Sequence, residues 1–150
     1  MSNLALKRSI PSVAGLLLLT ALVLSSCDKT AQRSGNSFAP PQQAQVITAQ
    51  DQRQRAVEVT ITAPVKRILP DDTEGLPHQR FLLQLANGST VLVAHNTNEA
   101  PRVPIAEGDL VTIHGEYGWN PKGGYIHWTH HSDTPRHEGG YIDFNGQRFQ

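Results

Sequence analysis

Alternation of apolar and polar residues constrains the fold of this chain more than any other feature. Between residues 57 and 63 every second residue is apolar, and the residues between them are Glu or Thr. Residues 80–85 repeat the pattern, with Phe81, Leu83 and Leu85 in phase. A period of two places one face of an extended strand in a core and the other in water. The pattern therefore predicts an all-β fold and argues against a helical one.

Turn residues divide the apolar runs into five predicted strands. These strands are expected over 57–63, 80–85, 90–95, 110–117 and 125 to about 130. Asn87-Gly88 is a two-residue hairpin signal, so the second and third strands should be antiparallel neighbours. Residues 69–77 are expected to form a turn-rich segment, and 96–107 a longer connection that contains two prolines.

A second hairpin is predicted at the C-terminus, around Asn145-Gly146. It would set Asp143 opposite Arg148 and Ile142 opposite Phe149. Five strands in this order resemble the OB-fold, a small partly open Greek-key barrel. The predicted fold class is thus a five-stranded OB-like barrel with a C-terminal β-hairpin, and a β-sandwich is the alternative.

The N-terminus has the features of an export signal. Lys7 and Arg8 precede an apolar run over 10–24 that is short for a membrane span. The run ends in Leu-Ser-Ser-Cys, which resembles the lipobox of bacterial lipoproteins and contains the one cysteine of the chain, Cys27. The resemblance implies lipidation of Cys27, for example with palmitate, and anchoring on the periplasmic side of a membrane. Asp28 resembles an inner-membrane retention signal, but inner and outer membrane both stay open.

Composition divides the chain into three parts. Residues 1–27 are the expected lipoprotein signal peptide. Residues 28–55 are rich in Gln, Ser, Ala and Pro and are expected to be a flexible linker, in which 44–56 could form a short helix. Residues 56–150 are expected to form a single all-β domain. Lys plus Arg and Asp plus Glu are balanced at 13 each, which makes nucleic acid an improbable partner.

The second half of the chain resembles an uncharacterised bacterial family of small exported proteins. The segments that carry the likeness are HQRFLLQLANG (78–88), VAHN (93–96), APRVP (100–104), GEYGWNPKGG (115–124), IHWTHH (126–131) and HEGGYI (137–142). The family has no assigned activity. The resemblance therefore supports the domain boundary and implies no chemistry.

Histidines are the densest group of reactive side chains. Four of the seven, His127, His130, His131 and His137, lie in one short stretch with Asp133. Imidazoles and a carboxylate suit zinc or another transition metal, so His130, His131, Asp133 and His137 are a candidate metal site. His127 is left out because, on an extended strand, it would lie about 13 Å from His131. The alternatives are histidines that hydrogen-bond within a tight loop, and a pH sensor.

Three hypotheses for the function follow from these residues. The leading one is a module that binds a small ligand or an envelope protein, with Trp119, Tyr117 and His114 as candidate contacts and Trp128 in the core. The others are a metal-dependent hydrolase that uses the histidine cluster and a structural component of the envelope. His114 and Glu116 share a strand face and could do acid/base work, but no complete catalytic motif accompanies them.

The lipobox gives a direct prediction. Cys27→Ala should leave an unprocessed precursor that incorporates no labelled fatty acid, because the thiol that accepts the lipid is gone. Metabolic labelling with a palmitate analogue measures this, and Ser26→Ala, which keeps a small residue beside the thiol, should be labelled like the wild type. Normal acylation of the Cys27 variant would remove the lipoprotein assignment.

Overall fold

The computed structural model describes residues 40–150 of the 150-residue chain. The predicted signal peptide, Cys27 and linker residues 28–39 lie outside this part. Within it, the elements are α1 (Pro40–Asp51), β1 (Arg55–Asp72), β2 (His78–Gln84), β3 (Thr90–Asn96), β4 (Leu110–Gly118), β5 (Tyr125–His127), β6 (Tyr141–Phe144) and β7 (Gln147–Phe149). Within residues 40–150, no helix is both long enough and apolar enough to span a membrane.

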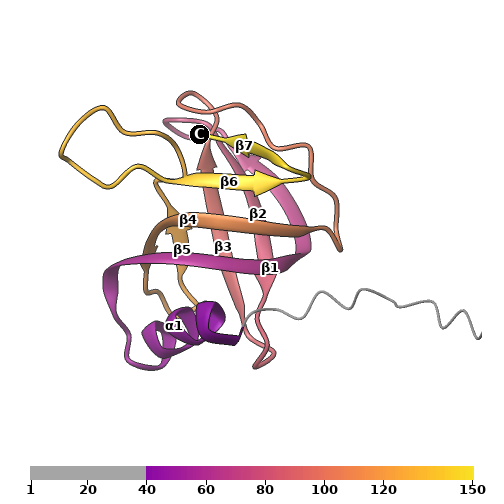
Figure 1. Ribbon diagram of the computed structural model, residues 1–150, viewed down its shortest axis with the longest axis vertical. Helices are drawn as coiled ribbons and strands as arrows, with labels where there is room; N and C mark the ends of the chain where they lie inside the picture. The colour runs from indigo at the N-terminus through magenta and orange to yellow at the C-terminus, as the bar shows by residue number, and fades with distance from the viewer. Residues whose placement is uncertain (1–39) are drawn as a thin grey trace, which may run out of the picture. The chain divides into compact units, whose positions relative to one another are not determined.

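Five strands form a closed ring. β1 pairs with β2, β2 with β3, and β5 with β4 in antiparallel fashion, while β3 and β5 are parallel. An additional antiparallel pairing of β4 with β1 closes the ring. In Figure 1, β1, β4 and β6 cross in front of β2, β3 and β5. The prediction of an all-β, five-stranded OB-like barrel with a C-terminal hairpin is confirmed.

The first strand is longer than the sequence predicted. It continues to Asp72 through the segment expected to be turn-rich. Val65 lies opposite Leu83 and Arg67 opposite Leu82, so Lys66 is an extra residue on β1. A bulge of this kind bends a strand and increases its twist. The bend lets one strand pair with β4 along its first half and with β2 along its second.

The barrel interior contains the apolar residues of each predicted alternation. In β1, the buried residues alternate with partly exposed ones, and β2, β3 and β4 follow the same pattern. Side chains that are fully buried in the strands include Ile61, Ala63, Phe81, Leu83, Val93, Ile113, Ile126 and Ile142. The opposite faces of β1 and β4 point outward and contain the polar residues, as a period of two requires.

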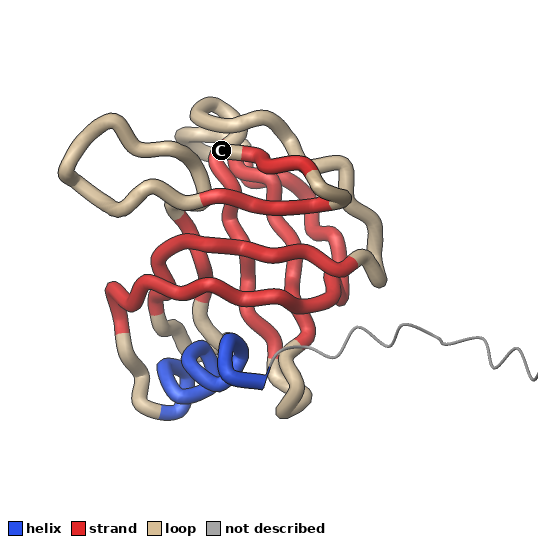
Figure 2. Tube along the Cα trace, viewed as in Figure 1, coloured by secondary structure: helices blue, strands red, loops and turns tan. Residues whose placement is uncertain are grey.

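The helix α1 covers one end of the barrel (Figure 2). Its Val46 and Ala49 are completely buried in the core. Gln43 donates to the carbonyl oxygen of Thr62, and Gln50 donates to those of Thr90 and Gly123. Residues 40–51 are therefore packed helix rather than the flexible linker that the sequence suggested. The helix begins and ends earlier than the short helix expected over 44–56.

The two predicted hairpins differ in their turns. Asn145 and Gly146 both have positive φ, 49° and 77°, as a two-residue type I′ turn requires. Asp143 lies opposite Arg148, and two hydrogen bonds of 2.8 Å join their side chains, so this prediction is confirmed. At Asn87-Gly88 the loop has three residues instead of two, because Leu85 pairs with Ser89 and Gly88 takes a φ of 84°.

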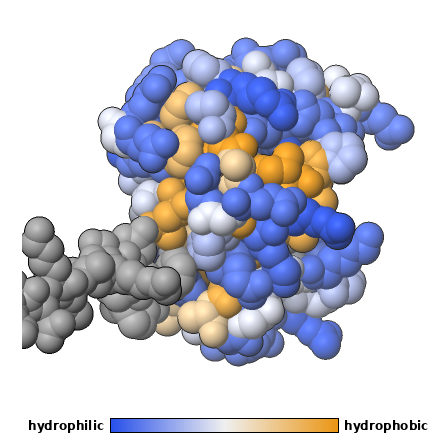
Figure 3. Space-filling model, turned by 90° about the vertical axis from the view of Figure 1, so that its right-hand side faces the viewer, coloured by the Kyte–Doolittle hydropathy of each residue, from blue (hydrophilic) through white to orange (hydrophobic). Residues whose placement is uncertain are grey.

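Figure 3 shows one face of the molecule, on which hydrophobic residues gather in separate patches between hydrophilic ones. Among residues 40–150, Leu76 is the large hydrophobic residue that is exposed, with 53% of its surface accessible to solvent. This residue lies in the connection between β1 and β2, beside the groove described below.

The buried face of α1 predicts a loss of stability on truncation. Val46→Ala removes two buried methyl groups, so the free energy of unfolding should fall by about 1–2.5 kcal/mol. Thr48→Ala on the exposed face of the same helix is the matched control and should change it by less than about 0.5 kcal/mol. Urea denaturation followed by circular dichroism measures both. Equal stability of the two variants would mean that the helix does not contribute to the core.

Candidate functional site

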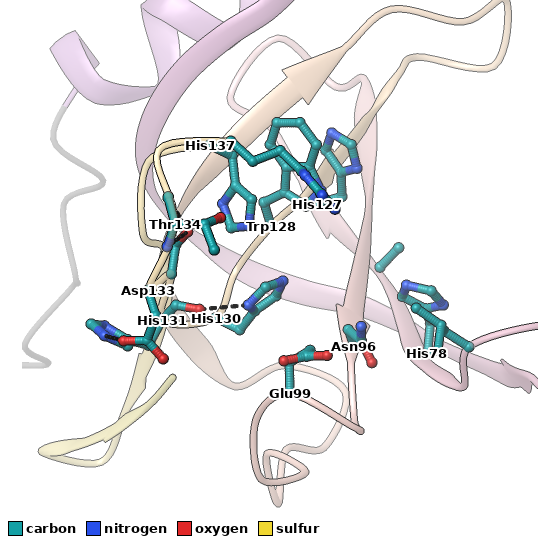
Figure 4. A pocket seen from close by; sticks show the side chains of 14 residues that line it. His78, Asn96, Glu99, His127, Trp128, His130, His131, Asp133, Thr134 and His137 are labelled. Carbon is teal, nitrogen blue, oxygen red and sulfur yellow. Dashed lines mark hydrogen bonds and ion pairs between the residues drawn. The ribbon is translucent and has the colours of Figure 1, made fainter.

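A groove of about 450 Å³ opens beside the ends of β2 and β3. One wall contains His78, Asn96 and Glu99, and the other is the connection between β5 and β6, residues 128–140 (the β5–β6 loop; Figures 1 and 4). Five of the seven histidines line this groove: His78, His127, His130, His131 and His137. The groove is therefore the place where most of the imidazoles gather.

The β5–β6 loop begins and ends at two special backbone positions. β5 ends at His127, three residues before the predicted end, because Trp128 has a left-handed φ of 51° that an extended strand cannot continue. At the other end, the amide of Gly140 donates to the carbonyl oxygen of His130 over 2.8 Å. A Cβ on Gly140 would overlap the carbonyl oxygen of Trp128, so this close approach requires glycine.

Aromatic and imidazole rings form a continuous stack along the groove. The ring centroids of His127 and Trp128 are 4.5 Å apart, and those of Trp128 and His137 are also 4.5 Å apart. His130 meets His137 edge-on at 5.0 Å. Trp128 is partly exposed in this stack and is absent from the core cluster, whereas the sequence analysis expected it in the core. Its positive φ turns the side chain out of phase with Ile126.

The predicted metal residues each bind a near neighbour in the chain. His130 donates from Nδ1 to the carbonyl oxygen of His131 over 2.8 Å, and His131 Nε2 lies 2.9 Å from Asp133 Oδ1. His137 donates from Nδ1 to the carbonyl oxygen of Glu138. Among the described residues, no three of these four side chains bring ligand atoms within 4.8 Å of one another. Their arrangement matches the alternative of histidines that hydrogen-bond within a loop.

The three residues expected to contact a ligand lie outside the groove. Tyr117 is completely buried inside the barrel. Trp119 packs partly against the core, and the guanidinium of Arg53 lies 5.3 Å from its ring. His114 is on the outer face of β4, where its ring stacks on Tyr141 at a centroid distance of 5.3 Å. The structure therefore does not bring these three side chains together.

His114 instead belongs to a second group of polar residues. Glu58 on β1, His114 on β4 and Glu138 at the end of the β5–β6 loop place one ligand atom each within 4.8 Å of one another. Beside them, His127 Nε2 lies 3.2 Å from Glu116 Oε1. Burial raises the pKa of Glu58, and repulsion from the Glu138 carboxylate raises it further. Sequence reasoning missed Glu58 and Glu138, because the pairing of β1 with β4 brings Glu58 to His114 and the course of the β5–β6 loop brings Glu138 there.

Another hollow, of about 350 Å³, lies over the outer faces of β1, β2 and β3. It combines Leu82 and Leu92 with the cations Arg80 and Lys122. This hollow contains none of the histidines, so it is chemically distinct from the groove.

His95 is a structural histidine. It is completely buried, its Nε2 donates to the carbonyl oxygen of Pro101 over 3.1 Å, and its Nδ1 accepts from the hydroxyl of Thr129 over 2.8 Å. Because a carbonyl oxygen can only accept, Nε2 carries a hydrogen, and in the neutral ring Nδ1 then accepts from the hydroxyl. Burial lowers the pKa of His95 below its ordinary value of 6.5.

The lowered pKa of His95 predicts a pH-dependent stability. The unfolded chain binds the proton more tightly, so the contribution of His95 is complete above about pH 6.5 and is lost as the pH falls below that value. Between pH 7.5 and 5.5 the free energy of unfolding should therefore decrease more in the wild type than in His95→Gln. Urea titrations at both pH values measure this, with the exposed His131→Gln as control. Equal decreases in all three proteins would contradict the prediction.

A comparison with protein families identifies the family of this chain. Residues 30–150 match the model of the family described as "Protein of unknown function (DUF3465)". A search of curated proteins found no match. The matched range contains α1, the whole barrel, the groove and the group formed by Glu58, His114 and Glu138 (the carboxylate–histidine group). The chain therefore belongs to the DUF3465 family.

Proposed function

We propose that this protein is a lipid-anchored binding module of the cell envelope that takes a short oligosaccharide into the groove between the β5–β6 loop and the ends of β2 and β3. The observation that carries the proposal is the convergence of five histidines and Trp128 on one hollow. Its volume lies within the range of about 300–1,000 Å³ that is typical of small-ligand sites.

The groups that line the groove suit a polyhydroxylated ligand. A neutral imidazole donates at one ring nitrogen and accepts at the other, the Asn96 amide does both, and the Glu99 carboxylate accepts. Sugar hydroxyls also donate and accept, so they can pair with each of these groups. The ring stack of Trp128 and His137 adds an apolar surface for the face of a sugar ring.

Charge and fold favour a saccharide over a nucleic acid. OB-type barrels bind oligonucleotides and oligosaccharides on their second and third strands, and the groove lies at one end of these strands. The chain has a formal net charge of zero, which provides no general attraction for a polyanion. An uncharged envelope saccharide meets both conditions.

The anchoring part of the proposal rests on the lipobox at Cys27. Two or more acyl chains hold a protein stably at a bilayer, which would keep the module beside the polymers of the envelope. A metal-dependent hydrolase built on His130, His131, Asp133 and His137 has weaker support, because each of these side chains is engaged with a neighbour in the chain.

The two tryptophans of the chain provide a matched test. Chitotriose and maltotriose are titrated into the ¹⁵N-labelled protein, and we expect one of them to shift amide signals of the groove residues. Trp128→Phe should weaken that binding about tenfold by removing most of the stacking surface, whereas Trp119→Phe, outside the groove, should not change it. No shift with either sugar, or shifts confined to the hollow at Arg80 and Lys122, would contradict the proposal.

A further inference from the structure

The group Glu58, His114 and Glu138 lies on the outer face of the pairing between β1 and β4. In that pairing Glu58 is directly opposite Glu116, and Thr60 is directly opposite His114. Glu58 and His114 are therefore diagonal neighbours on one face, a distance that long side chains can bridge. Glu138 completes the group from the β5–β6 loop, with its Oε1 3.4 Å from His114 Nε2.

The imidazole of His114 is held in one orientation. Its Nδ1 lies 2.8 Å from the hydroxyl oxygen of Thr60, and its ring stacks on Tyr141. When Nδ1 donates to this hydroxyl, Nε2 carries the lone pair on the side of Glu138, whose Oε1 lies 3.4 Å away. Metal-bound histidines are typically oriented in this way, by a hydrogen bond from the nitrogen that does not bind the metal.

One carboxylate oxygen of the group lacks a hydrogen-bond partner. Glu58 Oε2 is buried and has no hydrogen-bond partner among residues 40–150. A buried acceptor without a partner costs about 1–3 kcal/mol, and more when it is charged. The neighbouring carboxylates, Glu116 and Glu138, repel its charge. A cation at this point would satisfy the oxygen and offset the repulsion.

We propose that Glu58, His114 and Glu138 bind one divalent transition-metal ion of the zinc class. One imidazole nitrogen and two carboxylate oxygens are ligands that zinc accepts, and three protein ligands leave a fourth position for water. This site differs from the sequence-predicted set of His130, His131, Asp133 and His137. It also does not depend on the proposed saccharide binding, because none of its three ligands lines the groove.

The metal would hold the β5–β6 loop against the barrel. Glu58 and His114 belong to strands, whereas Glu138 belongs to the loop, and its side chain is 62% exposed. The preceding residue, His137, is part of the ring stack in the groove (Figure 4). An ion that fixes Glu138 therefore also restrains the position of His137. The site would act as a clamp that shapes one wall of the groove.

Zinc titration of the full-length chain, purified in detergent and stripped with a chelator, tests the site. Calorimetry and elemental analysis should give about one equivalent of Zn²⁺ that is lost or weakened at least tenfold in Glu58→Gln and in Glu138→Gln. His130→Ala and His131→Ala, from the sequence-predicted set, should bind zinc like the wild type. Ca²⁺ should bind far more weakly, because it prefers oxygen ligands alone.

Loop dynamics and stability separate a metal site from a purely structural role. Zn²⁺ should slow amide hydrogen exchange in residues 128–140 of the wild type and raise its melting temperature, with neither effect in Glu138→Gln. Metal-free Glu58→Gln should be at least as stable as the metal-free wild type, because the substitution removes a repelled carboxylate.

Zinc binding that persists in both glutamine variants, or that disappears in His130→Ala, would overturn the proposal. Saccharide binding in the presence of chelator is measured separately, so the failure of one proposal leaves the other testable.

Discussion

The pairing of β1 with β4 closes the barrel and also creates the group of residues that we propose as a metal site. Nine pairs of residues run from Arg55 opposite Gly118 to Pro64 opposite Leu110. The register of this pairing brings Glu58, Thr60 and His114 to one outer face. Beyond it, the extra residue Lys66 bends β1 toward β2. Without the bend, β1 could not pair with both β2 and β4, and the barrel would stay open with two unpaired strand edges.

The β5–β6 loop connects the two candidate sites. Its consecutive residues His137 and Glu138 serve different partners, since His137 stacks on Trp128 and Glu138 reaches His114. The backbone at Trp128 and the bond between Gly140 and His130 hold the base of the loop. A change that moves the base would therefore disturb the groove and the carboxylate–histidine group together.

Local pattern was sufficient to predict the strands, because the period of two reports burial residue by residue. The C-terminal hairpin was also predictable in detail, since a two-residue turn fixes the pairing of Asp143 with Arg148. The helix was harder to predict. Gln43 and Gln50 give the segment the composition of a linker, but in the fold they bind backbone groups of distant strands. Such hydrogen bonds have no signature in the local sequence.

The candidate sites show the same limit. Proximity in sequence suggested a metal site among His130, His131, Asp133 and His137, yet short-range hydrogen bonds engage these side chains one by one. The group that does converge combines Glu58, His114 and Glu138, which are far apart in the chain. Nothing in the sequence fixes the register of β1 against β4, because 37 residues (73–109), which include two other strands, separate them. Long-range register therefore had to come from the structure.

The two ends of β2 and β3 have different roles in this arrangement. At the end where Gln84 lies opposite Thr90, the helix α1 covers the core, and its Gln50 donates a hydrogen bond to the carbonyl oxygen of Thr90. At the other end, where His78 lies opposite Asn96, the groove opens. The chain enters the barrel through α1, so the covered end and the groove lie at opposite ends of β2 and β3.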